Sequence, residues 1–400
     1  MLLHWIWFAT LPGVNIRLKH QLLERFSDPE ELFRTENFSH EPQISQELAE
    51  SLKNKDLTLA RRIMTDCKQA QLSILTMRDA AYPSRLRCIS DPPLVLYYKG
   101  YMPDFEEQPA IGIVGTRKAT ANGMVNAKKM SGEITACGGL VVSGGAAGID
   151  TAALEGALDA GGACVAVLGC GADVVYPKSN NLLFHKISEV GCILSEYPPG
   201  TEPRPWQFPE RNRIISGLSN GVLVVEAPKN SGALITAREA LLQGRDVFAV
   251  PGNVGNPNCE GSNSLLEDGA AVALSGWGVM KEYEGVYACV AKRSCVLPDP
   301  EEELPLMVAQ HFPDALKTEA DKKVVDNSVS GAYIDRERIL EGLDPFSRTI
   351  VEKLGPEPIP VDDLIAMVEA PPNQVLGALT MLALGGVVEN HPGRLVSLKH

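Results

Sequence analysis

Two turns in the first half of the chain have the composition of an anion-binding site. The first, Gly115–Arg117, follows the apolar run Ala110–Val114, and the second, Ser143–Ala146, follows the apolar run Gly139–Val142. Their small residues let a ligand approach the backbone N–H groups closely, and such groups near the start of a helix attract negative charge. These turns therefore predict the binding of an anion such as a phosphate group.

A repeating pattern around the turns indicates the scaffold that positions them. From residue 109 to 285, short apolar runs alternate with amphipathic stretches of helical length, which is typical of the βα units of a parallel sheet. The expected strands are Ile111–Val114, Leu140–Val142, Cys164–Leu168, Cys192–Leu194, Val222–Val225, Val247–Val250 and Ala271–Leu274. We expect a doubly wound, extended Rossmann-like α/β fold, in which ligands bind beyond the carboxyl ends of the strands.

The helices between these strands carry candidate capping residues. The expected helices are Thr120–Cys137, Asp150–Ala160, Lys178–Ser188, Arg211–Leu218, Ala233–Gln243 and Ser262–Glu267. Thr120, Asp150 and Ser262 are predicted as N-caps, because a short polar side chain at that position accepts a hydrogen bond from the first turn.

Changes of pattern divide the chain into four parts. We predict a small helical domain over residues 1–80, the Rossmann-like domain over 81–285, an acidic linker over 286–335 and a winged-helix-like domain over 336–400. In the last domain the third helix, Pro372–Leu384, has no lysine or arginine. A recognition helix that enters the major groove is normally basic, so a protein contact or a structural role is favoured over DNA binding there.

The first domain resembles a helix-hairpin-helix or SAM-like module. Trp5, Ile6 and Phe8 are expected to face its core, and a break at residues 11–16 separates its first two helices. Asn15 stands where such hairpins carry their second glycine, and asparagine adopts the left-handed conformation less freely than glycine. Two interpretations stay open, a phosphate-holding hairpin and a purely structural one, and the weakly basic flanks favour the second.

Composition limits the classes of function. The formal charge of −13 argues against a broad nucleic-acid-binding surface, although a local basic groove is compatible with it. Nine cysteines without a C-x-x-C pair indicate reduced thiols and no metal site. The apolar opening is too short to span a bilayer and lacks the basic start of a signal peptide, so we expect a cytoplasmic protein without a membrane partner.

Rossmann-like folds commonly bind a dinucleotide, but the turn residues of this chain argue against one. Ser143 occupies the place of the first glycine of a G-x-G-x-x-G motif, and no acidic residue after the strand ending at Leu168 is placed for a ribose hydroxyl. NAD and FAD are therefore not expected, and we predict no cofactor.

Cations and aromatic residues gather on the loops at the same edge of the sheet. The cations are Arg117, Lys178, Arg204, Arg211 and Arg213, and the aromatic residues are Tyr176, Tyr197, Trp206 and Phe208. Such alternation is typical of proteins that hold a single-stranded backbone while bases stack on aromatic rings. The alternative is that these arginines are ion-paired parts of the fold, and we expect this for at least one of Arg211 and Arg213.

Several ordered motifs together resemble one known family. They are VGTR at 114–117, SGGAAGID at 143–150, YPKSN at 176–180, SEYPPG at 195–200, PERNRIISGLS at 209–219, SGALITA at 231–237 and PGN at 251–253. The chain closely resembles the DNA-processing protein A family, DprA or Smf. This resemblance implies a non-enzymatic, cytosolic, dimeric protein that binds and protects incoming single-stranded DNA and helps to load a RecA-type recombinase in natural transformation.

The turns, the loop residues and the resemblance together predict a site for single-stranded DNA. Its expected residues are Gly115, Thr116, Arg117, Ser143, Gly144, Gly145, Ala146, Tyr176, Lys178, Asn180, Phe208, Arg211 and Asn212. No catalytic residue is expected.

A nucleotide-processing enzyme is the competing class. The stretch Ser231–Glu239 resembles the P-G-G-x-G-T-x-x-E motif of cytokinin-activating phosphoribohydrolases, and its Thr236 and Glu239 match. The glycine pair is missing, and we expect Ile235 to fill space that a phosphoribose needs. Without a second placed acid or a nucleophile–base pair, the catalytic requirements are incomplete.

Overall fold

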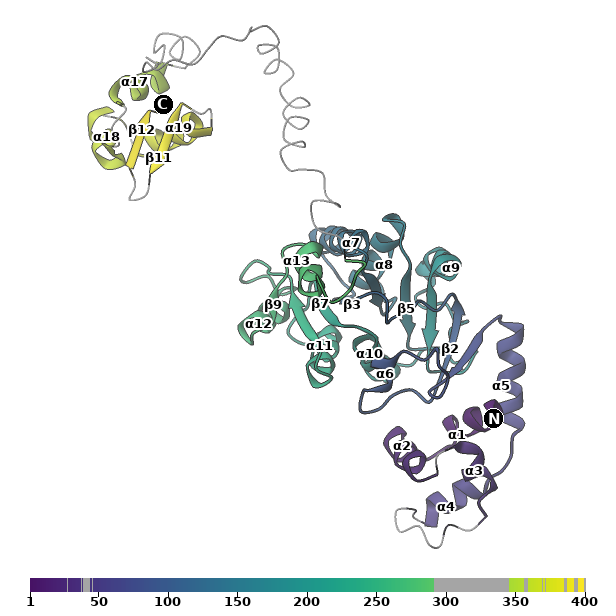
Figure 1. Ribbon diagram of the computed structural model, residues 1–400. Coiled ribbons are helices and arrows are strands. Elements are labelled where there is room, and N and C mark those ends of the chain that lie inside the picture. Colours follow the sequence, from purple (N-terminus) through teal and green to yellow (C-terminus); the bar gives the residue numbers. More distant parts are fainter. Residues whose placement is uncertain are drawn as a thin grey trace. The chain divides into compact units, whose positions relative to one another are not determined.

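The computed structural model describes residues 1–290 and 345–398, except 27, 37, 39–43, 45, 356–358, 369, 371, 385–386 and 392–394. The chain divides into two compact units, Met1–Phe312 and Pro313–His400 (Figure 1). Residues 291–335 of the predicted acidic linker lie outside the described residues.

The larger unit is built on a nine-stranded sheet with the order β1-β2-β6-β5-β4-β3-β7-β8-β9. Its strands are β1 Ser73–Thr76, β2 Val95–Gly100, β3 Ala110–Val114, β4 Leu140–Ser143, β5 Cys164–Leu168, β6 Cys192–Ser195, β7 Gly221–Val224, β8 Asp246–Ala249 and β9 Ala271–Val272. Pairing is parallel from β6 to β9, whereas β2 pairs antiparallel with β1 and β6. The predicted doubly wound, mostly parallel sheet is confirmed, and all seven expected strands are present.

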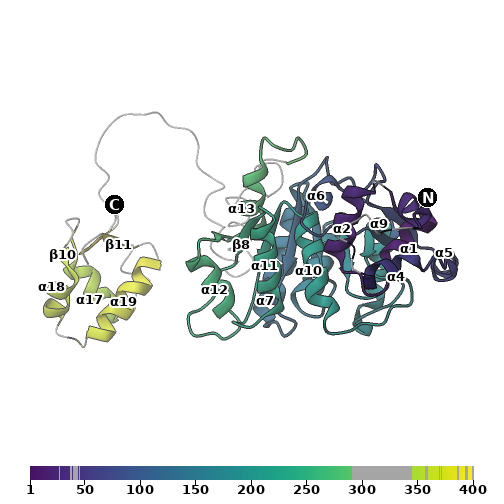
Figure 2. The same cartoon turned by 90° about the horizontal axis from the view of Figure 1, so that it is seen from below.

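Helices cover both faces of this sheet, as the strand residues require. They are α6 Ser84–Arg87, α7 Ala121–Ala136, α8 Ile149–Asp159, η1 Lys178–Asn180, α9 Asn181–Val190, α10 Gln207–Leu218, α11 Gly232–Leu242, α12 Glu260–Glu267, α13 Gly276–Met280 and η2 Lys281–Tyr283. Alternate residues of β3 point to opposite faces: Ile111 and Ile113 join the core under α7, α8 and α9, and Ala110 and Val114 join the core under α10 and α11. Figure 2 shows α10, α11 and α12 along one face.

The capping predictions hold at one helix of the three. Thr120 caps α7 by accepting a hydrogen bond from the N–H of Gly123. The predictions for Asp150 and Ser262 are wrong, because the N-caps of α8 and α12 are Gly148 and Cys259. Asp150 lies in the first turn of α8 and Ser262 is buried inside α12, so each helix begins earlier than its polar residue indicated.

The strand order places a switch point between β3 and β7. From β3 the chain moves outward through β4, β5 and β6, and it then returns to place β7 on the other side of β3. The loops that follow β3 and β7 therefore diverge to opposite faces, and open α/β sheets bind ligands in the crevice left there.

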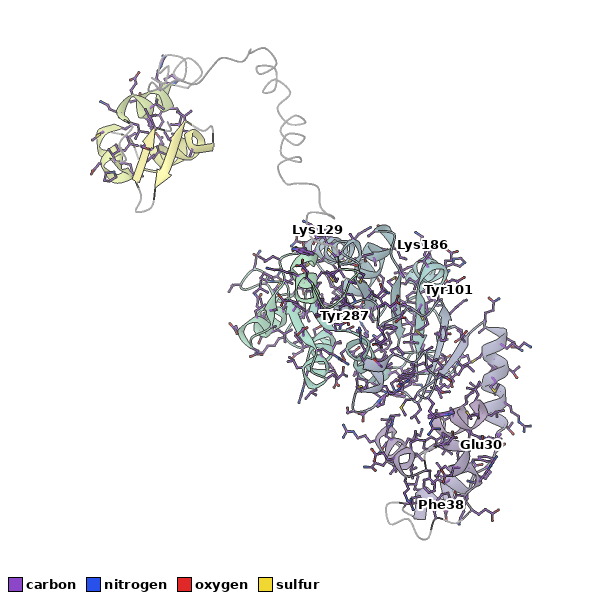
Figure 3. The ribbon with its side chains drawn as sticks, viewed as in Figure 1. Glu30, Phe38, Tyr101, Lys129, Lys186 and Tyr287 are labelled. Carbon is purple, nitrogen blue, oxygen red and sulfur yellow. The ribbon has the colours of Figure 1, made fainter. Side chains whose placement is uncertain are left out.

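At the other end of β3, the Tyr287 hydroxyl, labelled in Figure 3, accepts hydrogen bonds from Arg85 and Asn220 at 2.9 and 2.8 Å.

Five helices are described in the part of the chain that precedes the sheet. They are α1 Leu2–Ala9, α2 Ile16–Arg25, α3 Pro29–Arg34, α4 Gln46–Lys53 and α5 Thr58–Gln69. Trp5, Ile6 and Phe8 are buried, as predicted, in a core continuous with that under α7 and α8. Asn15 has an ordinary φ of −71° and caps α2 through a 2.8 Å hydrogen bond from Leu18 N–H, so this position needs no glycine.

In the described part of the smaller unit, three helices pack against a short sheet of order β10-β12-β11. Its elements are α17 Pro345–Lys353, β10 Ile359–Pro360, α18 Val361–Val368, α19 Pro372–Leu384, β11 Val388–His391 and β12 Leu395–Leu398. Leu364, Val375 and Val396 are fully buried in its core. Among the described helices of the chain, none is long and apolar enough to cross a membrane.

Candidate functional site

A cavity of about 690 Å³ opens at the switch point, beyond the carboxyl ends of β3 and β7. Cavities of this size accommodate small ligands or single nucleotides of a strand. Eight of the predicted site residues line it: Gly115, Thr116, Arg117, Ala146, Tyr176, Phe208, Arg211 and Asn212. The structure therefore brings together residues from four separate segments of the sequence.

A cation and two aromatic rings form a row at the cavity. The guanidinium carbon of Arg117 lies 4.8 Å from the centroid of the Phe208 ring, within the range of a cation–π interaction. The rings of Phe208 and Tyr176 follow, with centroids 5.6 Å apart and an interplanar angle of 39°. Arg117 is exposed and Tyr176 is 41% exposed, so both can reach a ligand from solvent.

The backbone of the first turn is fixed by the neighbouring loop. Thr116 N–H donates to the carbonyl oxygen of Glu226 at 2.7 Å. A Cβ atom at Gly115 would lie 2.5 Å from the side chain of Ile149 and 2.9 Å from the same carbonyl oxygen, so glycine is required there. Glu226 was not predicted from the sequence. The one feature that could have indicated it is the position of an acidic residue shortly after the strand β7.

The second turn offers less to a ligand than the sequence indicated. Ser143 is fully buried, and its hydroxyl donates to the carbonyl oxygen of Ile113 at 2.7 Å. The N–H of Ala146 donates to the carboxylate of Asp150 at 3.3 Å. Asn180 is buried and supports the turn, because its amide donates to the carbonyl oxygen of Gly145 at 3.1 Å. An internal carboxylate thus already occupies this turn.

Two charged side chains are buried at the cavity. Arg211 is 3% exposed and donates to the carbonyl oxygens of Gly144, at 2.7 Å, and Val167. Burial lowers the pKa of Arg211 to about 10. Burial also raises the pKa of Asp150 to about 6, although the nearby Arg211 and Arg117 oppose that shift. The buried part of the site therefore holds one cation and one weakly acidic carboxyl group.

Three further cations predicted at this edge, Lys178, Arg204 and Arg213, lie outside the cavity lining. Lys178 is exposed at the start of η1. Arg213 contacts both carboxylate oxygens of Glu196, at 2.8 and 2.9 Å. Of the two arginines on α10, Arg213 is therefore the ion-paired one, as expected for at least one of them.

The residues shared with phosphoribohydrolases do not converge on one site. Thr236 lines the large cavity, whereas Glu239 lines a separate cavity of about 300 Å³ together with Arg17 and Arg213. Ile235 is 40% exposed and is not part of the large cavity's lining. The expectation that Ile235 fills that space is wrong, since the turn of α11 directs it to solvent.

Two parts of the chain match known protein families. Residues 73–284 match the family described as DNA recombination-mediator protein A, and residues 335–394 match the DprA winged helix domain. The chain belongs to the DprA family. The resemblance seen in the motifs is thus confirmed, together with the α/β fold and the C-terminal winged helix.

Similarity to individual DprA relatives covers much of the chain. Protein Smf of Synechocystis sp. is 31% identical over 417 aligned residues, which cover 98% of this chain and 97% of that protein. The DprA of Bacillus subtilis is 40% identical over 221 residues, covering 55% of this chain and 74% of that protein.

Two solved DprA structures are similar in fold. The Streptococcus pneumoniae protein superimposes with a TM-score of 0.58 at 32% identity, covering 70% of this chain and 98% of that one. The Helicobacter pylori protein gives 0.50 at 29% identity, covering 54% and 97%, and its structure concerns the single-stranded DNA binding mode of that protein.

Proposed function

We propose that this member of the DprA family binds single-stranded DNA along the cavity at the β3–β7 switch point. In this proposal it protects incoming single-stranded DNA and helps to load a RecA-type recombinase in natural transformation. It acts in the cytoplasm as a homodimer, without a cofactor and without catalysing a reaction. Family membership supports the recombination-mediator role, and the cavity supports the choice of ligand.

The row formed by Arg117, Phe208 and Tyr176 is the observation that carries the proposal. A base can stack on an aromatic ring whatever its identity, and such stacking contributes about 1–3 kcal/mol per base. The guanidinium of Arg117 lies beside the ring, and the exposed Lys118 lines the same cavity, so both cations can meet the phosphates of the same strand. This combination favours a strand over an isolated base or an isolated anion.

Charge reversal of Arg117 tests the groove directly. We expect Arg117→Glu to weaken oligo-dT binding at least tenfold in a gel-shift or fluorescence anisotropy titration. The slope of log K against log salt should also shrink by about 0.7 for each phosphate that the variant no longer neutralises. Lys129→Glu is the matched control, since it makes the same charge change at an exposed position of α7 that does not line the cavity (Figure 3).

Unchanged binding in the charge-reversal variants would contradict the proposed groove. If Arg117→Glu and Lys178→Glu both bind oligo-dT as the unmodified protein does, the strand does not follow this groove. Circular dichroism and urea unfolding of each variant separate a binding defect from a folding defect.

Recombinase loading needs an assay of its own. A RecA-type recombinase hydrolyses ATP when it assembles on single-stranded DNA, and a bound single-strand-binding protein slows that assembly. The chain should restore the ATPase rate on coated DNA, and Arg117→Glu should not. A chain that binds oligo-dT but leaves the rate unchanged would bind DNA without loading the recombinase.

A further inference from the structure

An internal carboxylate occupies the place where the second turn would hold an anion. Asp150, in the first turn of α8, is 6% exposed and lines the large cavity. Its Oδ2 accepts the hydrogen bond from the N–H of Ala146. Amide groups in a glycine-rich turn beside a helix N-terminus are a preferred position for a phosphate group. In this chain Asp150 takes that position.

The buried cation of the cavity lies beside the same carboxylate. A Cβ atom at Gly144 would lie 2.5 Å from Nη2 of Arg211 and 2.6 Å from Oδ2 of Asp150, so both charged groups crowd that glycine. The other terminal nitrogen of Arg211 is directed to the carbonyl oxygens of Gly144 and Val167. Both deep attractors of an anion, the turn amides and the guanidinium, are therefore next to a negative charge of the protein itself.

The cations at the mouth of the cavity are exposed to solvent, which screens them more strongly from Asp150 than it screens the buried Arg211. Arg117 and Lys118 are exposed, and among the described residues that line the cavity Asp150 is the one acid. An internal phosphodiester carries one negative charge and can stay at this mouth. A phosphate monoester carries between about 1.5 and 2 negative charges near neutral pH, so a carboxylate nearby repels it more strongly.

We propose that Asp150 is the specificity-determining residue of this cavity: it occupies the deep anion position, so that the cavity accepts internal phosphodiesters and rejects phosphate monoesters. Free nucleotides and terminal phosphates of a strand belong to the rejected class. The statement about phosphodiesters rests on the proposed binding of single-stranded DNA. Rejection of phosphate monoesters depends on the cavity alone and can be tested without DNA.

The substitution Asp150→Asn removes the charge and keeps the shape. An asparagine oxygen can still accept the hydrogen bond from Ala146, while Arg211 loses its nearby negative charge. We expect dTMP to displace oligo-dT from Asp150→Asn at a concentration at least tenfold lower than from the unmodified protein. Asp159→Asn is the control, because it makes the same change on the same helix at an exposed residue that pairs with Lys128.

Sulfate binding to the unmodified protein gives a second test, which needs neither DNA nor a folded variant. Sulfate stays a dianion between pH 5 and pH 8, so a change of its affinity with pH reports on the protein. The charged groups that act on Asp150 are Arg211 of α10 and Arg117 of the loop after β3, and neither loses its charge in this range. Burial raises the pKa of Asp150 to about 6, so its carboxyl group is mostly neutral at pH 5. Calorimetry should show sulfate binding to the unmodified protein at least tenfold tighter at pH 5 than at pH 8.

The outcomes are distinct. In Asp150→Asn, sulfate should bind nearly equally at both pH values, and if that variant does not fold, the pH series of the unmodified protein decides. The proposal is overturned if sulfate binding is independent of pH in the unmodified protein, or if folded Asp150→Asn gains no affinity for dTMP or sulfate over Asp159→Asn. Absence of oligo-dT binding by the unmodified protein would instead reject the proposed function and leave the sulfate result standing.

Discussion

The carboxylate of Glu226 accepts two hydrogen bonds from Thr120, one from its N–H at 2.9 Å and one from its hydroxyl at 2.5 Å. Glu226 follows β7, and Thr120 ends the loop that follows β3 and carries Arg117. The carbonyl oxygen of Glu226 also receives the N–H of Thr116. One buried acid thus joins the two loops of the switch point and holds the loop on which the proposed DNA contact depends.

We predict that Glu226→Gln weakens both folding and binding. Glutamine has no negative charge, so the two charge-assisted hydrogen bonds from Thr120 are weakened and the free energy of unfolding should fall by about 1–3 kcal/mol in urea titrations. Oligo-dT affinity should fall several-fold because the loop with Arg117 is less well positioned. Glu267→Gln, an exposed acid on α12, is the control. Reduced stability with unchanged affinity would restrict Glu226 to the fold.

Arg213 should affect stability and leave DNA binding unchanged. Its guanidinium and the Glu196 carboxylate are largely buried, with side-chain exposures of 14% and 23%. Since hydrogen bonds between charged groups contribute about 1.5–3 kcal/mol, Arg213→Gln should lower the free energy of unfolding by that order. Oligo-dT affinity should stay within about twofold, after allowance for any unfolded fraction. A tenfold loss of affinity in a stably folded variant would instead show that Arg213 contacts the DNA strand.

The two arginines of α10 illustrate how far the sequence could lead. Residues two apart on a helix point about 200° apart, so Arg211 and Arg213 had to face different surroundings. The sequence could not say which faced the cavity, because that depends on where α10 packs against the sheet. The strands and the two turns were predictable because their signals, apolar runs ending in glycine, are local.

Asp150 shows the opposite case. Its type and position indicated an N-cap, but Gly148, with a φ of +85°, begins the helix instead. The partner of its carboxylate is the N–H of Ala146, whose direction depends on the conformation of the whole turn. The position of Glu226 was hidden for a similar reason: its partner Thr120 lies 106 residues earlier in the chain.

Asn15 should act as a helix cap and not as part of a phosphate-binding hairpin. Asn15→Ala removes the acceptor for Leu18 N–H and should cost about 1 kcal/mol of stability, whereas Asn15→Gly should cost only a few tenths. Both variants should bind oligo-dT normally in anisotropy titrations. If Asn15→Gly, which restores the second glycine of the hairpin pattern, binds oligo-dT clearly more tightly, the hairpin contacts DNA.

Asp150 should make the stability of the chain depend on pH in an unusual direction. Its pKa is about 6 in the folded protein and near 4 when unfolded, so between these values the folded state binds more protons. The free energy of unfolding should therefore decrease by about 2 kcal/mol as the pH rises from 4 to 7, and Asp150→Asn should lack this contribution. Urea titrations of both proteins across this range measure the difference, which cancels groups common to both.

Asp159 on the same helix has a pKa shifted in the opposite direction to that of Asp150. Its hydrogen bond and attraction to Lys128 lower its pKa, so it stabilises the folded protein as the pH rises and loses that effect in acid. The difference between the unmodified protein and Asp159→Asn should therefore have the opposite sign to that for Asp150→Asn. If both differences have the same sign, burial does not raise the pKa of Asp150. The charge balance around Arg211 would then differ from the one that excludes monoesters.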